Sequence, residues 1–71
     1  MKIRFKSEQA MNEFASLSLG YSNHNKNLAT RMGMKEFEVY TNPMDEWWDT
    51  PDGDFTISVE NESKYFDIVG I

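Results

Sequence analysis

The sequence predicts an α+β domain with the order β-α-β-β-β, in which one amphipathic helix packs on a small, mainly antiparallel sheet. Three patterns indicate this class: apolar and charged residues alternate over positions 1–6, apolar residues recur at helical spacing over 8–17, and alternation returns after position 34. A further strand is expected if residues 45–50 are extended. The 71 residues have room for one domain, spanning residues 1–71, with one small core.

The chain begins with a predicted strand followed by a helix. The strand places three bases on one face and three apolar side chains on the other, namely Lys2, Arg4 and Lys6 opposite Met1, Ile3 and Phe5. Ser7 stands at the N-cap of the helix, and Glu8 lies in its first turn, where a negative charge complements the helix dipole. Gly20 is expected to close the helix in the left-handed conformation.

The segment after this helix is predicted to be irregular. Residues 21–26, YSNHNK, are rich in turn-forming side chains and lack a period, which predicts a loop. Asn27 is then expected to cap a short helical turn that Gly33 ends.

The second half of the chain is predicted to form strands joined by turns. The strands are expected over residues 36–41, 55–60 and 65–69, with turns at 42–43, 50–54 and 61–63. Phe37 and Val39 lie on the inner face of the first of these strands. In the 50–54 loop, Pro51 takes the first turn position and Gly53 supplies a positive φ.

The Trp47-Trp48 pair is the most informative feature, because adjacent residues on a strand point to opposite faces of the sheet. With a three-residue loop over residues 51–53, Trp48 pairs with Thr56 and Trp47 with Ile57. This register places Trp47 in the core and Trp48 on the polar face, as a hot spot for a protein partner. The alternative is that Trp48 lies over a loop or covers a small second cluster.

Charge is distributed unevenly along the chain. Residues 1–35 carry a formal charge of +4 and residues 36–71 carry −9, within a net charge of −5. This asymmetry indicates either a charged partner or attraction between the two halves of the fold.

No base occurs between Lys35 and Lys64, and this acidic stretch contains the predicted partner-binding surface. That surface consists of Tyr40, Asp45, Glu46, Trp48, Asp49, Asp52 and Asp54. Carboxylates on a rigid fold can imitate the phosphates of DNA and occupy a nucleic-acid-binding protein. The alternative is a solvated hairpin that protects a sheet edge. The spacing of the acids does not match a calcium-binding loop, so we predict no metal site.

The bases of the first half form the alternative, nucleic-acid-binding surface. It consists of Lys2, Arg4, Lys6, Lys26 and Arg31, with Tyr21 available for stacking. If a strand bearing Glu36 and Glu38 lies beside the first strand, the bases instead form a cross-strand ladder of opposite charges. We favour the ladder, because the candidate stacking residues Tyr40 and Trp48 lie among acids.

The sequence contains no recognisable catalytic motif. The single histidine, His24, lies in the polar loop without a nucleophile beside it, and there is neither a cysteine nor a glycine-rich phosphate loop. We therefore predict no enzymatic activity and no cofactor. The lack of cysteine favours the cytoplasm, and no apolar run approaches the roughly 18 residues that span a bilayer.

The short cysteine-free chain, its layout and its acidic second half resemble the small accessory proteins with which tailed bacteriophages engage host enzymes. The resemblance covers the general plan and supplies no site residues. It implies a protein-binding module or inhibitor that acts on a basic surface of a host protein in the host cytoplasm. The alternatives are a nucleic-acid-binding domain and a homo-oligomer in which the positive half of one copy meets the negative half of another.

Overall fold

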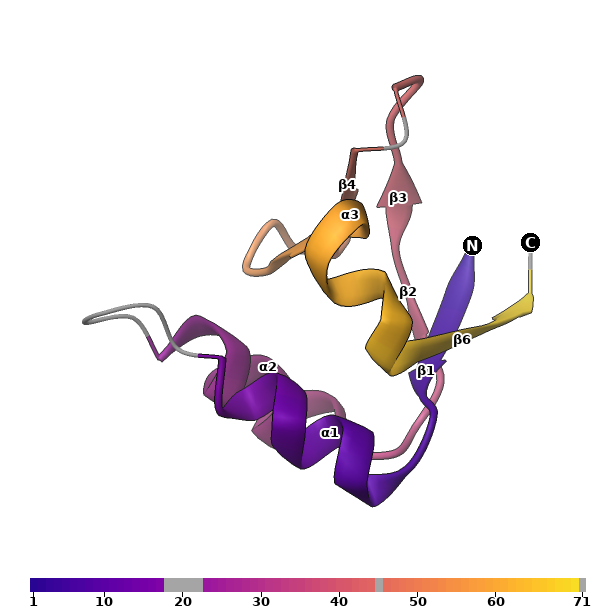
Figure 1. Ribbon diagram of the computed structural model, residues 1–71. Helices are drawn as coiled ribbons and strands as arrows, with labels where there is room; N and C mark the ends of the chain where they lie inside the picture. Colours follow the sequence, from indigo (N-terminus) through magenta and orange to yellow (C-terminus); the bar gives the residue numbers. More distant parts are fainter. Residues whose placement is uncertain (18–22, 45, 71) are drawn as a thin grey trace.

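The computed structural model describes residues 1–17, 23–44 and 46–70 and confirms the α+β class (Figure 1). Its elements are β1 (Lys2–Phe5), α1 (Glu8–Ala15), α2 (His24–Met32), β2 (Phe37–Glu38), β3 (Tyr40–Thr41), β4 (Trp47–Asp49), β5 (Thr56–Ser58), α3 (Val59–Glu62), the 3₁₀ helix η1 (Ser63–Tyr65) and β6 (Phe66–Gly70). None of the helices in these parts of the chain is long and apolar enough to cross a membrane.

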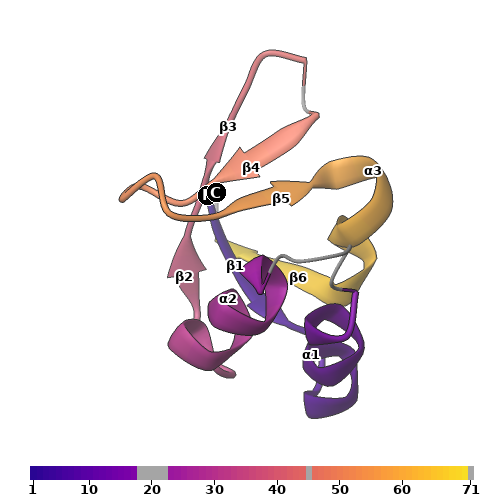
Figure 2. The same cartoon turned by 90° about the vertical axis from the view of Figure 1, so that its left-hand side faces the viewer.

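The strands form two three-stranded antiparallel sheets, with the orders β2-β1-β6 and β3-β4-β5, where we expected one sheet. Figure 2 shows the second sheet above the first, with α1 and α2 below. The strand expected over residues 36–41 divides at Val39, so that its two halves pair with different neighbours. The Val39 N–H donates to the carbonyl of Met1 (2.8 Å) and holds this crossing point. A twisted strand can change partners in this way along its length.

Helix α1 begins as predicted but is shorter than expected. The Ser7 hydroxyl accepts a hydrogen bond from the Ala10 N–H (3.0 Å), which satisfies one of the unpaired donors of the first turn. The helix ends at Ala15, and Leu17 beyond it is 39% exposed. The predicted stop at Gly20 lies outside the described residues.

The segment after α1 differs most from expectation, because a second helix begins at His24 where a loop was predicted. Gly33 ends this helix as expected, with a φ of +56°. Leu28 and Ala29 bury one side of α2, and such packing stabilises a helix whose intrinsic propensity is weak. The short helical turn expected to begin at Asn27 is therefore part of a longer helix whose N-cap is Asn23, and the fold has more than the one amphipathic helix expected.

A third helix replaces the end of the strand predicted over residues 55–60. The Ser58 hydroxyl accepts from the Asn61 N–H (3.3 Å), and the Glu62 carboxylate reaches back to accept from the Ser58 N–H (2.8 Å). This reciprocal capping starts α3 at Val59 and makes the predicted turn over residues 61–63 helical. The last strand, β6, forms within one residue of its predicted bounds.

Phe66 joins the two sheets in the core. Its ring stacks on Phe5 with centroids 4.4 Å apart and meets Phe14 edge to face at 5.3 Å. On the side of the second sheet it contacts Trp48 edge to face at 6.4 Å. One cluster of buried side chains thus extends from α1 and the first sheet into the second.

Candidate functional site

The outer face of the β3-β4-β5 sheet, the face turned away from the core, carries the aromatic and acidic side chains expected of a binding surface. Tyr40 pairs across the strands with Asp49, and Asp49 pairs with Thr56, so these three side chains share one face. Trp47 lies two residues before Asp49 and therefore points to the same side. Tyr40 is 59% exposed and Trp47 is 46% exposed.

This arrangement reverses the predicted faces of the two tryptophans. Trp48 pairs with Ile57 and is 5% exposed, so the expectation that Trp48 is the exposed residue and Trp47 the buried one was wrong. The register of β4 on β5 differs from the predicted register by one residue. A one-residue shift moves every side chain of a strand to the opposite face.

The length of the hairpin turn causes this shift. The Thr50 N–H donates to the Phe55 carbonyl (2.9 Å), which closes a loop of four residues rather than three. The Thr50 hydroxyl accepts from the Phe55 N–H (3.1 Å) and donates to Asp52 (2.6 Å), so it replaces part of the strand ladder. Gly53 adopts a φ of +78°, as expected.

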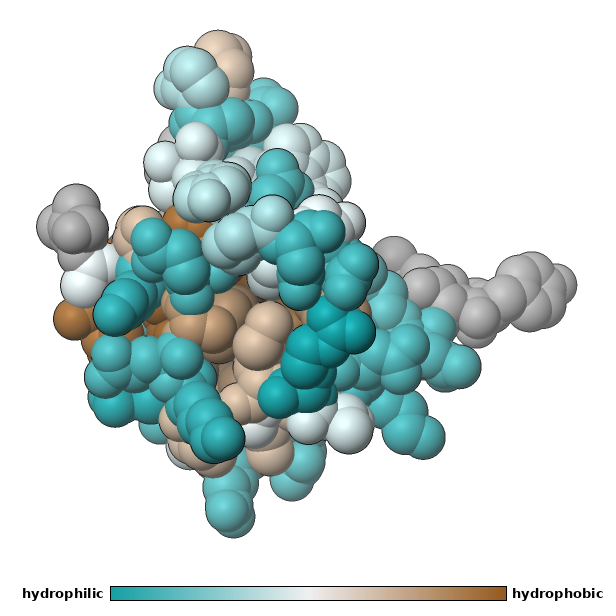
Figure 3. Space-filling model, turned by 180° about the vertical axis from the view of Figure 1, so that it is seen from behind, coloured by the Kyte–Doolittle hydropathy of each residue, from teal (hydrophilic) through white to brown (hydrophobic). Residues whose placement is uncertain are grey.

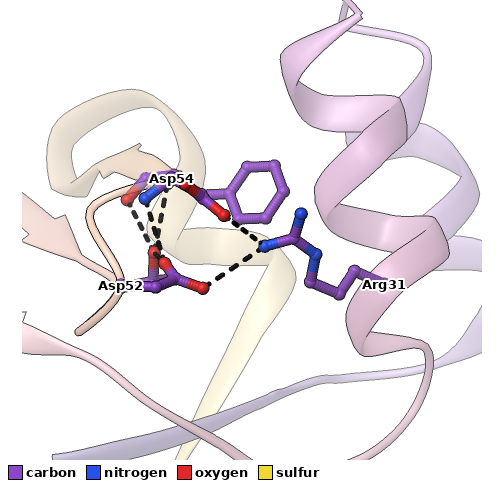
Figure 4. Close-up of polar contacts among 5 residues, drawn as sticks. Arg31, Asp52 and Asp54 are labelled. Atoms are coloured by element: carbon purple, nitrogen blue, oxygen red, sulfur yellow. Dashed lines mark hydrogen bonds and ion pairs between the residues drawn. The ribbon is translucent and has the colours of Figure 1, made fainter.

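The acids of the turn are held by a base from α2 (Figure 4). One nitrogen of Arg31, Nη1, lies 2.6 Å from Asp54 and 3.3 Å from Asp52. The Arg31 guanidinium also lies over the ring of Phe55, 4.7 Å from its centroid. Two residues predicted for a protein partner and one predicted for nucleic acid thus bind one another.

The cluster of Arg31, Thr50, Asp52 and Asp54 favours the ionised form of Asp52. Hydrogen bonds from the Thr50 hydroxyl and the Asp54 N–H, with the nearby Arg31 charge, hold the pKa of Asp52 below its usual value of 3.8. The hydrogen bond that Arg31 donates to Asp54 raises the pKa of Arg31, so its guanidinium stays charged.

This lowered pKa predicts a stability difference that disappears in acid. Because the folded state favours the Asp52 carboxylate, this carboxylate stabilises the fold above pH 3.8, its usual pKa. The stabilisation is lost as the pH falls through the lower pKa that Asp52 has in the folded state. We expect Asp52→Asn to be less stable than the wild type at about pH 6.5 and equally stable at about pH 2, measured by urea unfolding. Glu46→Gln, which changes an exposed acid outside the cluster, serves as the control. A difference that persists in acid would rule out the charge as its cause.

The remaining predicted acids contribute in different ways. The hydroxyl of Thr56 donates to one oxygen of Asp49 (2.7 Å), and both side chains are exposed. Glu46 is exposed and immediately precedes β4. Asp45 lies outside the described residues.

Three of the five bases of the predicted alternative surface lie in ion pairs. Arg4 lies 3.9 Å from Glu36, Lys6 lies 3.3 Å from Asp67, and Arg31 binds the turn acids. The register also places Lys2 opposite Glu38. The expected ladder is therefore present in part: Arg4 pairs with Glu36, whereas Glu38 lies 3.5 Å from the N-terminal amine of Met1 and the partner of Lys6 comes from β6. Lys26 is exposed on α2.

The outer edge of β5 is closed by side chains that the sequence analysis did not identify. In an antiparallel pair, alternate residues of a strand bond to the neighbouring strand. The hydrogen bonds from Thr50 to Phe55 and from Val59 to Glu46 show that the odd-numbered residues of β5 face β4. Thr56 and Ser58 therefore direct their N–H groups away from β4. The Thr56 N–H donates to Nε2 of His24 (3.0 Å), and the Ser58 N–H donates to Glu62 (2.8 Å).

Asn25 connects these two acceptors. Its amide nitrogen donates to Glu62 (2.6 Å) and to the carbonyl of Phe14 (3.2 Å), while its oxygen lies 2.7 Å from Nδ1 of His24. Because Nε2 accepts a hydrogen bond, the ring proton is assigned to Nδ1, which donates to Asn25. The histidine predicted to lie in a loop therefore begins α2 and helps to hold β5 in place.

A groove of about 830 Å³ continues the outer face toward the helices. Trp47, Thr56 and Ser58 form one wall, and Leu17 and Tyr65 line it from the helical side. A partner that contacts Trp47 therefore has space beside it for an inserted side chain.

Among residues 1–17, 23–44 and 46–70, no group of three or more histidines or acids could hold a metal ion. Comparison of the chain with protein-family models, curated proteins and solved structures found no match. The resemblance to phage accessory proteins thus stays a prediction.

Proposed function

We propose that the protein is a binding module that captures a partner protein through Tyr40, Asp49 and Trp47 on the outer face of the β3-β4-β5 sheet. The observation that carries this proposal is an exposed carboxylate beside two exposed aromatic side chains on one face of the β3-β4-β5 sheet. Where the partner uses its basic surface to bind nucleic acid, the protein acts as its inhibitor.

The aromatic side chains supply the contact area. Trp and Tyr dominate the energetics of many interfaces because they bury a large area and lose little conformational entropy. Trp48 already fills the core beneath this sheet, so Trp47 is left with almost half of its side chain in water. The groove beside Trp47 extends the surface that a partner can cover.

The carboxylate selects for a basic partner. One oxygen of Asp49 accepts from the Thr56 hydroxyl, and the described residues place no base within ion-pair distance of it. An arginine of the partner can bind this carboxylate and stack its guanidinium on Trp47 or Tyr40. The acidic second half of the chain, with a formal charge of −9, attracts such a partner from a distance.

The turn acids play a smaller part than the sequence suggested. Asp52 and Asp54 share Arg31, so the field of the turn is partly neutralised by the fold. Their contribution to binding is to hold the turn that orients Trp47.

We expect the double variant Tyr40→Ala/Trp47→Ala to lose partner capture at least about tenfold, the effect of removing one interface hot spot. The measurement is affinity capture from the native host with the wild type and the variant, read by mass spectrometry, at two salt concentrations. Met44→Ala is the matched control, because Met44 is 74% exposed but precedes β4 in the β3-β4 connection. The partner is the protein retained by the wild type and by this control and lost from the double variant.

Equal capture by the double variant, with an unchanged circular dichroism spectrum, would exclude this face as the binding surface. Binding of a labelled oligonucleotide tests the alternative function, that of a nucleic-acid-binding domain. Binding that weakens steeply with salt and requires Lys2 and Lys26 would indicate a nucleic-acid-binding domain.

A further inference from the structure

His24 is the single histidine of the chain, and its ring closes part of the β5 edge. Nε2 of the ring accepts from the Thr56 N–H (3.0 Å), and Nδ1 lies 2.7 Å from the Asn25 oxygen. The Asn25 amide nitrogen donates to Glu62 and to the Phe14 carbonyl, which fixes the amide oxygen toward the ring. Both contacts of the ring therefore require a neutral imidazole with its proton on Nδ1.

Protonation of this ring removes an acceptor from the backbone. An imidazolium carries a proton on both nitrogens, so Nε2 has no lone pair left for the Thr56 N–H. Histidine is the side chain that ordinarily gains its proton between about pH 8 and about pH 5. Figure 3 shows a face of the molecule covered largely by hydrophilic side chains, and an exposed group of this kind can change its charge without breaking a backbone hydrogen bond. At His24, the same change sets two donors, the Nε2–H and the Thr56 N–H, against each other.

The charged groups that act on the ring come from four elements, namely Glu62 of α3, Lys64 of η1, Asp49 of β4, and Lys26 and Arg31 of α2 itself. Glu62 bonds to the Asn25 amide and favours a positive charge on the ring. Lys64 lines the same groove as the ring and opposes this charge. The positive end of the α2 dipole also opposes it, because His24 is the first residue of that helix. Since charges of both signs are present, the hydrogen bond from Thr56 determines which form of the ring the fold holds.

We propose that His24 is a pH-sensitive switch at the β5 edge, whose neutral ring holds the Thr56 N–H and whose protonated ring releases it to water. The release is local to this residue. The Ser58 N–H donates to Glu62 rather than to the ring, and Ile57 faces β4 on the other side of the strand. Thr56 is thus the amide of β5 whose partner depends on the protonation of His24.

The switch also acts on the outer face of the β3-β4-β5 sheet, a consequence that rests on the proposed function. The Thr56 hydroxyl donates to one oxygen of Asp49 (2.7 Å), and His24 holds the Thr56 backbone in place. Release of this backbone loosens the support of the carboxylate. Partner capture by the wild type should therefore weaken from about pH 7.5 to about pH 5 more than capture by His24→Gln, whose side chain does not titrate.

Amide hydrogen exchange of the free protein tests the switch without any partner, so its failure is distinguishable from failure of the proposed function. We expect the protection factor of the Thr56 amide, corrected for the intrinsic exchange rate at each pH, to fall about tenfold from about pH 7.5 to about pH 5, the effect of losing one hydrogen bond. Ile57, which pairs with Trp48, is the internal control and should keep its protection. The Thr56 amide shift should follow the same titration midpoint as the ring protons of His24.

His24→Gln is the matched variant, because its side-chain oxygen can accept from Thr56 at either pH. We expect the protection of Thr56 in this variant to be the same at both pH values. A Thr56 amide that does not change while the His24 ring titrates would overturn the proposal, as would a ring that stays neutral at about pH 5. An equal loss of protection at Thr56 and Ile57, or a neutral ring with its proton on Nε2 in a ¹⁵N spectrum, would also overturn it.

Discussion

Replacing Asn25 with alanine is expected to lower the free energy of unfolding by about 2–4 kcal/mol, because three groups each lose one hydrogen bond. The side chain is 7% exposed and connects Phe14, Glu62 and His24, which lie on three different helices. Alanine removes the donor of Oε2 of Glu62, whose other oxygen keeps the Ser58 N–H, and leaves the Phe14 carbonyl with the Leu17 N–H alone among the described donors. Since a domain of this size is stable by only a few kcal/mol, part of the variant should be unfolded at 25 °C.

Asn27→Ala is the matched control for this variant, because Asn27 lies on the same helix with an exposed side chain. We expect it to change stability by less than about 0.5 kcal/mol. Urea unfolding followed by circular dichroism measures both. Equal stabilities for the two variants would contradict the role assigned to Asn25.

The second large effect is expected at Trp48. Trp48→Ala should cost about 3–5 kcal/mol, because it removes a large side chain from the core and leaves a cavity. Trp47→Ala should cost less than about 1 kcal/mol, because its side chain is 46% exposed. Urea unfolding of the two variants gives the comparison, and a larger cost at Trp47 would contradict the register of the hairpin.

Packing rather than hydrogen bonding accounts for the contribution of Trp48. Its indole N–H is buried and has no hydrogen-bond partner among the described residues. Trp48→Phe removes this unpaired donor and keeps a ring near Phe66, so we expect it to cost less than Trp48→Ala.

The local signals of the sequence identified much of the fold. The cap at Ser7, the stop at Gly33 and the positive φ at Gly53 each depend on a residue and its immediate neighbours. The alternation that placed Phe37 and Val39 inside is likewise local, and both side chains are buried.

The face of each tryptophan could not be predicted, because it depends on a single hydroxyl. Pro51, Asp52 and Gly53 fit both a three-residue and a four-residue loop. The Thr50 hydroxyl, which bonds to Phe55 and Asp52, selects the longer one. The sequence therefore indicated that one tryptophan is exposed without determining which.

Long-range contacts account for the other differences. The amide of Asn25 bonds to Glu62, 37 residues away, and His24 bonds to Thr56, 32 residues away. These partners make a helix of a segment whose composition resembles a loop. The ladder on β1 was predictable for Arg4 and Glu36, whereas Lys6 binds Asp67 only because β6 lies beside β1.

The proposed binding face requires an outward-facing Trp47, and the accessibility of the two indole groups tests this most directly. A ¹H–¹⁵N spectrum of the wild type with a soluble paramagnetic agent reports both indole N–H signals, which Trp47→Phe assigns. We predict that the Trp47 signal broadens strongly while the Trp48 signal persists. Strong broadening of Trp48 with a protected Trp47 would contradict the register and, with it, the proposed binding face.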